Sequence, residues 1–204
     1  MKAEPAIAIL AKAPIPGLAK TRLIPAIGAH AAAVLQERLT ERTIETAIAT
    51  DLGLVTLWGT PDVRHASFRT LAARFPIALF PQPDGDLGAR MLAAIAAVNG
   101  PVLLLGTDCP ALTPAVLRAA AEALRDTDAV AIPASDGGYA LIGLHQPVPE
   151  LFNDMAWGTA GVMEETRRRA ETLGLRVVAL ETLWDVDLPD DLDRMEREYP
   201  ELAL

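Results

Sequence analysis

The sequence has few sulfur-containing and imidazole side chains. Its 204 residues include one cysteine, Cys109, and three histidines, His30, His65 and His145. A single cysteine excludes a disulfide within the chain and fits a reducing compartment. The histidines match no zinc-ligand spacing. We therefore expect neither disulfides nor a structural zinc, and a chain of this length can bury roughly 70% of its unfolded surface without them.

Long apolar runs are also missing. Hydrophobic residues make up 51% of the chain, but no run approaches the roughly 18 residues that a membrane-spanning helix requires. The apolar run 6–11 follows Glu4 and Pro5 and ends at Lys12, which does not fit a signal peptide. The sequence predicts a cytoplasmic protein without membrane contact, folded as one domain over residues 1–204.

Positive charge is scarce as well. Eighteen Lys and Arg residues stand against 27 Asp and Glu residues, which gives a net charge of −9. This balance argues against nucleic acid as a partner, because nucleic-acid binding needs a basic face. The charges are unevenly placed: residues 1–23 carry four basic side chains and residues 181–204 carry nine acidic ones. One end could bind an anion and the other a cation, although charge runs are also typical of solvated helix faces.

Short apolar runs alternate with segments of helical period, which predicts a three-layer α/β/α fold with a mixed, mostly parallel sheet of about seven strands. Thr60-Pro61 and Thr113-Pro114 each look like an N-cap followed by proline at the first helical position, and Gly174 fits a helix C-terminus. Asp136-Gly137 is typical of a hairpin turn, which makes the sheet mixed. The expected strands are 6–11, 54–58, 77–80, 101–106, 128–133, 139–144 and 175–180, and the expected helices are 29–50, 61–74, 86–99, 114–125, 159–173 and 189–198.

The predicted central strand ends in a carboxylate. Residues 102–105 are all apolar, as in a strand buried on both faces, and Asp108 follows directly. Ligands of open α/β sheets bind beyond the carboxyl ends of such strands, so Asp108 is a candidate site residue. Aspartate is also an ordinary turn former. Cys109 beside it has no predicted base, and a neighbouring carboxylate raises a thiol pKa, so we do not expect it to be a nucleophile.

Two further loops follow predicted strands. The first contains Lys12, Gly17, Lys20 and Arg22, which indicates a phosphate-binding loop, but Ala19 stands where a P-loop needs glycine. A solvated basic loop is the alternative. In the second loop, Gln82, Gly85 and Asp86 could contact a base or sugar, although Asp86 is also a good helix N-cap. Asp136 could act as a base or near a metal instead of only forming its turn.

Asp185 and Asp187 alternate in a segment that reads as extended, so their side chains share one face. If Asp187 and Asp108 converge, two carboxylates about 4 Å apart would repel by roughly 4 kcal/mol at an effective dielectric near 20. A divalent cation removes that conflict, and all-oxygen ligation favours magnesium or manganese. Asp190 and Asp191 need no functional explanation, because acids are favoured in a first helical turn.

Together these motifs resemble the glycosyltransferase-like family of radical-SAM/selenodomain-associated transferases, and more distantly the phospholactate and molybdenum-cofactor guanylyltransferases. The resemblance implies the nucleotide-diphospho-sugar transferase (GT-A) fold, metal binding at Asp108 and Asp187, and triphosphate binding by Lys12, Lys20 and Arg22. The motifs span almost the whole chain: KAPIPGLAKTRL at 12–23, GDLG at 85–88 with Arg90 and Met91, GTDCP at 106–110, DGGYALIG at 136–143 and DVD at 185–187.

Three functions fit these residues. The first is a magnesium-dependent nucleotidyltransferase that joins a nucleoside monophosphate to a small phosphorylated or carboxylated acceptor, with Lys20, Arg22 and Asp108 in the reaction. The second is a glycosyltransferase with a sugar-nucleotide donor and Asp136 as base, although GTD at 106–108 lacks a D-x-D motif. The third is a nucleotide sensor without catalysis. The base, the acceptor and the oligomeric state stay open.

Overall fold

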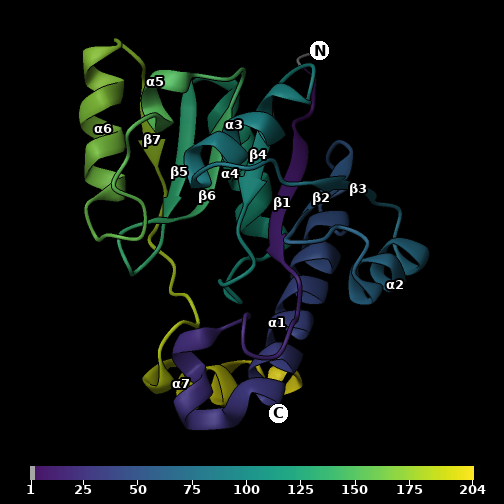
Figure 1. Ribbon diagram of the computed structural model, residues 1–204. Helices are drawn as coiled ribbons and strands as arrows, with labels where there is room; N and C mark the ends of the chain where they lie inside the picture. The colour runs from purple at the N-terminus through teal and green to yellow at the C-terminus, as the bar shows by residue number, and fades with distance from the viewer. Residues whose placement is uncertain (1–2) are drawn as a thin grey trace.

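The computed structural model describes residues 3–204 and joins seven strands in one sheet (Figure 1). The strand order is β3-β2-β1-β4-β6-β5-β7, and β6 runs antiparallel to both of its neighbours while all other pairs are parallel. The predicted mixed, mostly parallel sheet is thus confirmed. The strands are β1 (Ala6–Lys12), β2 (Val55–Thr60), β3 (Ala78–Pro81), β4 (Val102–Leu105), β5 (Ala129–Pro133), β6 (Tyr139–Leu144) and β7 (Val177–Ala179).

Helices cover both faces of the sheet, because alternate residues of the buried strands point to opposite sides. Leu103 and Leu105 of β4 pack in the core with α1, α2 and α4, whereas Val102 and Leu104 pack with α3, α5 and α6. This arrangement confirms the three-layer prediction. The helices are α1 (Ile24–Ile48), α2 (Ala66–Arg74), α3 (Leu87–Ala96), α4 (Pro114–Arg125), α5 (Pro149–Phe152), α6 (Val162–Thr172) and α7 (Pro189–Glu198), with 3₁₀ turns η1 (Thr21–Leu23) and η2 (Pro200–Leu202).

Local signals set some helix boundaries correctly. Thr113 caps α4 by accepting a hydrogen bond from the Val116 amide, with proline at the first helical position. Gly174 follows α6 with a left-handed φ of +68°, as a helix C-terminus requires. Asp86 caps α3 through the Ala89 amide. In each case the capping residue also explains why the helix begins or ends there.

Other boundaries were wrong. Helix α2 begins at Ala66 rather than at Pro61, because β2 continues to Thr60 by pairing with Lys12 of β1, and His65 is the cap. Helix α6 begins at Val162 rather than at residue 159, because the Thr159 hydroxyl donates to the Ala156 carbonyl instead of capping the helix. Helix α1 begins earlier than predicted, at Ile24, and crosses a non-helical residue at Gly28.

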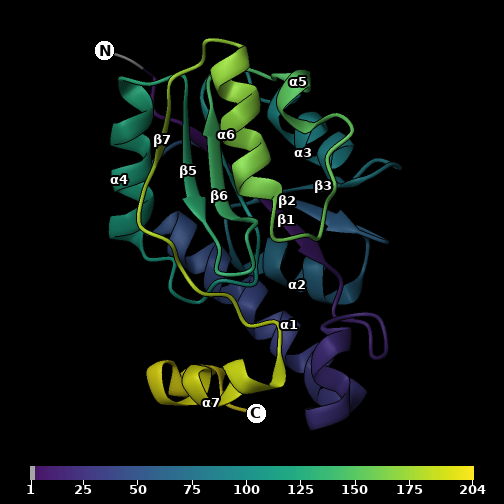
Figure 2. The ribbon, with the colours of Figure 1, turned by 90° about the vertical axis from the view of Figure 1, so that its left-hand side faces the viewer.

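The segment that follows β1 and the C-terminal segment meet beneath the carboxyl ends of the parallel strands. Helix α7 lies beside the first turns of α1 in both ribbon views (Figures 1 and 2). A separate apolar cluster joins them: it combines Leu23, Leu35 and Leu39 with Trp184, Val186, Leu192, Met195 and Leu202. This packing brings residues 20–22 beside residues 185–187. Over the described residues, none of the helices could cross a bilayer by its length and apolar character.

Candidate active site

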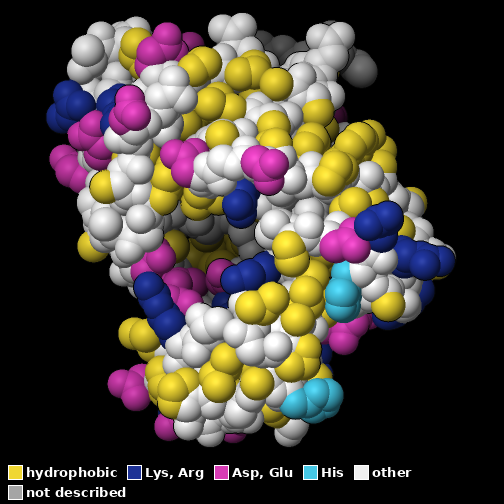
Figure 3. Space-filling view, viewed as in Figure 1, with side chains coloured by type: hydrophobic (Ala, Val, Ile, Leu, Met, Phe, Trp, Pro, Cys, Tyr) yellow, Lys and Arg dark blue, Asp and Glu magenta, His cyan; other side chains and the backbone are white. Residues whose placement is uncertain are grey.

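A cavity of about 490 Å³ opens at the carboxyl ends of β1 and β4. Its walls come from the basic loop after β1, from α3, from the turn between β5 and β6, from the loop before α6 and from the segment before α7. In the space-filling view it is a hollow near the centre of the molecule, bordered by both acidic and basic side chains (Figure 3). The predicted ligand position beyond the central strand therefore coincides with a cavity.

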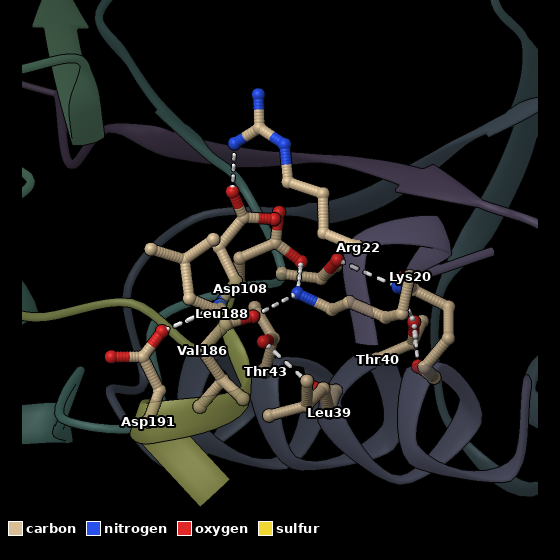
Figure 4. Close-up of polar contacts among 12 residues, drawn as sticks. Lys20, Arg22, Leu39, Thr40, Thr43, Asp108, Val186, Leu188 and Asp191 are labelled. Atoms are coloured by element: carbon tan, nitrogen blue, oxygen red, sulfur yellow. Dashed lines mark hydrogen bonds and ion pairs between the residues drawn. The ribbon is translucent and has the colours of Figure 1, made fainter. Parts of the chain in front are cut away.

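Lys20 connects the loop after β1 to the end of β4 and to the segment before α7. Its Nζ donates to Asp108 Oδ1 at 2.5 Å and to the Val186 carbonyl at 2.6 Å, and only 3% of its side chain is exposed (Figure 4). The Val186 amide in turn donates to the Asp108 carbonyl at 2.8 Å. Lys20 itself has a left-handed backbone, with φ of 47° and ψ of 46°. The lysine is thus held in one position by two segments that lie far from it in the sequence.

A second ion pair lies beside the first. Arg22 Nη1 donates to Asp187 Oδ2, joining the basic loop to the segment before α7. Asp191 supports this segment, because its Oδ2 accepts from the amides of Asp187 and Leu188 at 2.9 and 2.7 Å. Asp191 is therefore accounted for by the start of α7, as the sequence predicted.

Four carboxylates share this part of the cavity. The pKa of Asp185 is raised to about 6, first by burial and then by the negative charges of Asp136, Asp108 and Asp187. Lys20 and Arg22 pair with Asp108 and Asp187 only, so Asp185 and Asp136 carry uncompensated charge among the described residues. Carboxylate oxygens with excess negative charge fit a hard divalent cation such as magnesium or manganese. Within residues 3–204, however, no group of three or more His, Cys, Asp or Glu side chains is arranged to hold a metal ion.

The remaining predicted nucleotide-binding residues are placed unevenly. Lys12 and Gln82 line the cavity, whereas Gly17, Gly85 and Asp86 do not. The Gln82 amide is fixed in orientation, because its Nε2 donates to the carbonyls of Ala11 at 3.1 Å and Trp58 at 2.7 Å. This leaves Oε1 as the acceptor that Gln82 can offer to a ligand.

The turn that carries Asp136 is packed against the loop before α6. Asp136 Oδ1 accepts from the Gly138 amide at 2.8 Å, and the carboxylate lines the cavity. Gly137 has a φ of +90°, and a Cβ there would lie 2.3 Å from the Ala160 carbonyl oxygen. The Met163 amide also donates to the Gly137 carbonyl at 2.9 Å. Glycine is thus needed at this position both for its conformation and for the close approach.

Gly137→Ala is expected to destabilise the protein by about 3 kcal/mol, because left-handed backbone strain adds to an overpacked contact. Gly158→Ala is the matched control: Gly158 has a φ of +76°, but a Cβ at this position would meet no atom within 4 Å, so only the strain of about 1 kcal/mol remains. Urea unfolding of both variants measures the difference. Equal losses would show that the contact with Ala160 contributes nothing.

Cys109 is a buried residue of the cavity lining, and burial, followed by the charges of Asp185 and Asp108, raises the pKa of its thiol to about 12. At pH 8 the thiolate fraction would be on the order of 10⁻⁴. We expect an aromatic disulfide reagent to leave the native protein unmodified at pH 8 and to react with one thiol after unfolding in urea. Rapid reaction of the native protein would contradict this environment. The structure agrees with the sequence prediction that Cys109 is no nucleophile.

Sequence reasoning assigned no site role to Arg90, Tyr139 or Trp157, all of which line the cavity. Arg90 stands in the first turn of α3, four residues after the cap Asp86. A basic residue in the first turn of a helix that opens at the carboxyl edge of the sheet was the available signal. The Trp157 ring stacks near Phe152, with centroids 6.4 Å apart, so it also packs in the protein interior.

Comparison with solved structures shows the same fold elsewhere. A protein from Desulfovibrio desulfuricans G20, described as a nucleotide-diphospho-sugar transferase, is 29% identical and superposes with a TM-score of 0.86, covering 96% of this chain and 87% of that one. A nucleotidyl transferase from Methanothermobacter is 15% identical, with a TM-score of 0.67 over 97% of this chain and 98% of its own. Rv0371c from Mycobacterium tuberculosis H37Rv, in a manganese complex, is 16% identical, with a TM-score of 0.53 over 96% and 98%. The predicted nucleotide-diphospho-sugar transferase fold is confirmed.

Sequence comparison gives a family. Among curated proteins no sequence matches the chain. A family model does match residues 43–159, which is more than half of the chain and includes β4, Asp108 and the turn with Asp136. The chain therefore belongs to the family described as "Uncharacterized protein conserved in bacteria (DUF2064)".

Proposed function

We propose that the protein is a magnesium-dependent nucleotidyltransferase, which moves a nucleoside monophosphate from a nucleoside triphosphate to a small phosphorylated or carboxylated acceptor and releases pyrophosphate. The observation that carries the proposal is the contact of Lys20 with Asp108 and Val186 at the mouth of the cavity. It places a buried cation among carboxylates, which is the combination that polyphosphate bound with a divalent cation requires.

The acidic residues would hold the cation. Asp108 and Asp187 would ligate the cation through their carboxylate oxygens, and the nearby Asp185 would add negative charge. The manganese complex of Rv0371c, a protein of this fold, supports the choice of a divalent ion. When bound, magnesium or manganese would neutralise phosphate charge and orient the phosphate oxygens.

The basic residues would act on the triphosphate. Lys20 and Arg22 form ion pairs with Asp108 and Asp187. With a divalent cation held by these carboxylates, the ammonium and guanidinium groups would donate to phosphate oxygens and to the departing pyrophosphate. Lys12, on the same wall of the cavity, would add a third positive charge. An acceptor that is already ionised needs no general base, so the attack on the α-phosphorus depends on positioning.

Gln82 would read the base. Because two backbone carbonyls fix its amide, its Oε1 favours a base that presents an N–H donor. The motif resemblance to radical-SAM/selenodomain-associated transferases and to phospholactate guanylyltransferases supports a small acid as acceptor. Recognition of the base by Gln82 and a small acid as acceptor are therefore both part of the proposal.

A glycosyltransferase is the second candidate. It is favoured by the position of Asp136 at the cavity, where the carboxylate could serve as base, and by the description of the relative from Desulfovibrio desulfuricans G20. In this case the cation would bind the diphosphate of a sugar nucleotide.

The two functions differ in their products. The protein is incubated with magnesium, each nucleoside triphosphate and a panel of phosphorylated and carboxylated small acids, and pyrophosphate and the nucleotide product are followed by phosphorus NMR. Pyrophosphate release that depends on one acid supports the proposal. Nucleoside diphosphate release from a sugar nucleotide, without pyrophosphate, supports the glycosyltransferase. Binding of nucleotide without either product would identify a sensor.

A further inference from the structure

Arg90 is a cavity residue for which the proposed chemistry has no role. It lies in the first turn of α3, and its side chain lines the cavity wall. Lys20 and Arg22 are paired with carboxylates, whereas Arg90 forms no ion pair with any residue from 3 to 204. Its buried Nε–H also has no hydrogen-bond acceptor within that range. The guanidinium group of Arg90 can therefore still donate hydrogen bonds to a ligand.

A second donor on the same cavity is in the same state. The indole Nε1–H of Trp157 is buried and has no acceptor among the described residues. Trp157 packs directly on α3, because a Cβ at Gly88 would lie 3.1 Å from its Nε1. Buried N–H groups in native proteins are nearly always bonded to protein or to water. Arg90 and Trp157 line one cavity, and each has a buried N–H without a protein acceptor among the described residues, so both are candidates for donating to a ligand there.

The surroundings restrict that ligand. Leu10, Met91, Leu104 and Ile142 line the same cavity, so the ligand can place a short apolar body against them. The four carboxylates come from other elements: the end of β4, the turn after β5 and the segment before α7. A ligand with an anionic group therefore has Arg90 to bind and these carboxylates to avoid.

We propose that Arg90 and Trp157 form the subsite for an oxyanion, a carboxylate or a phosphate, on the acceptor substrate, and that Arg90 determines acceptor specificity. The name acceptor rests on the proposed function; the anion subsite itself does not. Arg90 would bind two oxygens through Nε–H and one Nη–H, since the planar guanidinium matches this geometry, and the indole N–H would donate to one of them.

The test observes Trp157 directly. In the ¹⁵N–¹H spectrum, the indole signal of Trp157 is identified by its absence in Trp157→Phe, which keeps an aromatic ring and removes the donor. Lactate and methyl phosphate are titrated separately at constant ionic strength, with lactamide as the neutral match for lactate. We expect at least one anion to shift the Trp157 signal to saturation, and lactamide to leave it in place. Which of the two anions binds more tightly distinguishes the carboxylate from the phosphate.

Variants separate a built subsite from general charge. Arg90→Gln should weaken the anion affinity about tenfold or more, and Arg90→Lys should weaken it nearly as much, because lysine keeps the charge but not the planar pair of donors. Arg64→Gln is the matched control, since Arg64 is 86% exposed and lies outside the cavity lining. The indole signals of Trp58, whose N–H is already bonded to Thr56, and of Trp184 should stay in place.

Two results would overturn the subsite: a Trp157 signal that neither anion moves, or anion affinity that is the same in Arg90→Gln.

A competition experiment tests the assignment to the acceptor. Saturating nucleoside triphosphate with magnesium is added to the protein with bound anion. Competition with the anion would show that the position belongs to the nucleotide, and would overturn the acceptor assignment. Anion binding with these properties in a protein that never releases pyrophosphate would leave the subsite standing and refute the proposed function instead.

Discussion

Lys20→Met is expected to lower kcat/KM for nucleotidyl transfer by about 10²- to 10³-fold, the effect of removing one preorganised donor to developing charge. The variant should still fold, because the Asp108 side chain is 53% exposed and can be hydrated when its partner is lost. Without nucleotide, its affinity for manganese should rise, since Asp108 no longer has a competing cation. Pyrophosphate release measures the first effect and calorimetric titration with manganese the second.

Because activity is expected to fall while manganese affinity rises, the experiment distinguishes loss of Lys20 from general damage to the site. Arg64→Met, which removes a positive charge from an exposed side chain, is the control for net charge. A Lys20→Met protein with full activity would exclude Lys20 from the reaction. Lower manganese affinity together with lower activity would show that the lysine organises the acidic residues instead of competing for them.

Asp108→Asn is the second change with a large expected effect. It removes a proposed cation ligand, so the magnesium-dependent activity should fall to background and nucleotide-free manganese binding should weaken. It also replaces the carboxylate that pairs with the buried Lys20 by a neutral amide, whose oxygen can accept a hydrogen bond but does not compensate the ammonium charge; this should lower the free energy of unfolding by about 2 kcal/mol. Activity, manganese titration and urea unfolding measure the three consequences.

The double variant separates these consequences. In Lys20→Met/Asp108→Asn the buried ammonium charge that Asp108→Asn leaves uncompensated is gone, so we expect part of the lost stability to return while activity stays at background. A double-mutant cycle gives the coupling free energy between the two side chains. Strictly additive losses of stability would contradict the ion pair that joins the basic loop to β4.

Much of the fold follows from local chemistry. The caps at Asp86 and Thr113 and the hairpin at Asp136-Gly137 each depend on residues within three or four positions, which a sequence displays directly. The start of α2 does not. Thr60-Pro61 satisfies the local rule for a helix start, but pairing of β2 with β1 extends the strand through Thr60. Tertiary pairing overrides local preference there.

Some features of the candidate site could likewise be predicted from the sequence, and others depend on the folded chain. From the sequence, the convergence of Asp108 and Asp187 was a condition rather than a prediction; in the structure both line the same cavity. The unpaired state of Arg90 and the raised pKa of Asp185 could not be predicted, since both depend on which side chains share a cavity. Lys20 was predicted to bind phosphate, but its left-handed backbone and its contact with the Val186 carbonyl are properties of the folded chain.

The contacts of Lys20 join positions that are 88 and 166 residues apart in the sequence. Local opening of residues 20–23 or of residues 185–191 would therefore dismantle the candidate site while the sheet stayed intact. Amide hydrogen exchange resolves such local opening from global unfolding. A nucleotide that bridges these segments should slow exchange in residues 20–23 and 185–191 together, so that ligand binding and the ordering of these two segments are thermodynamically coupled.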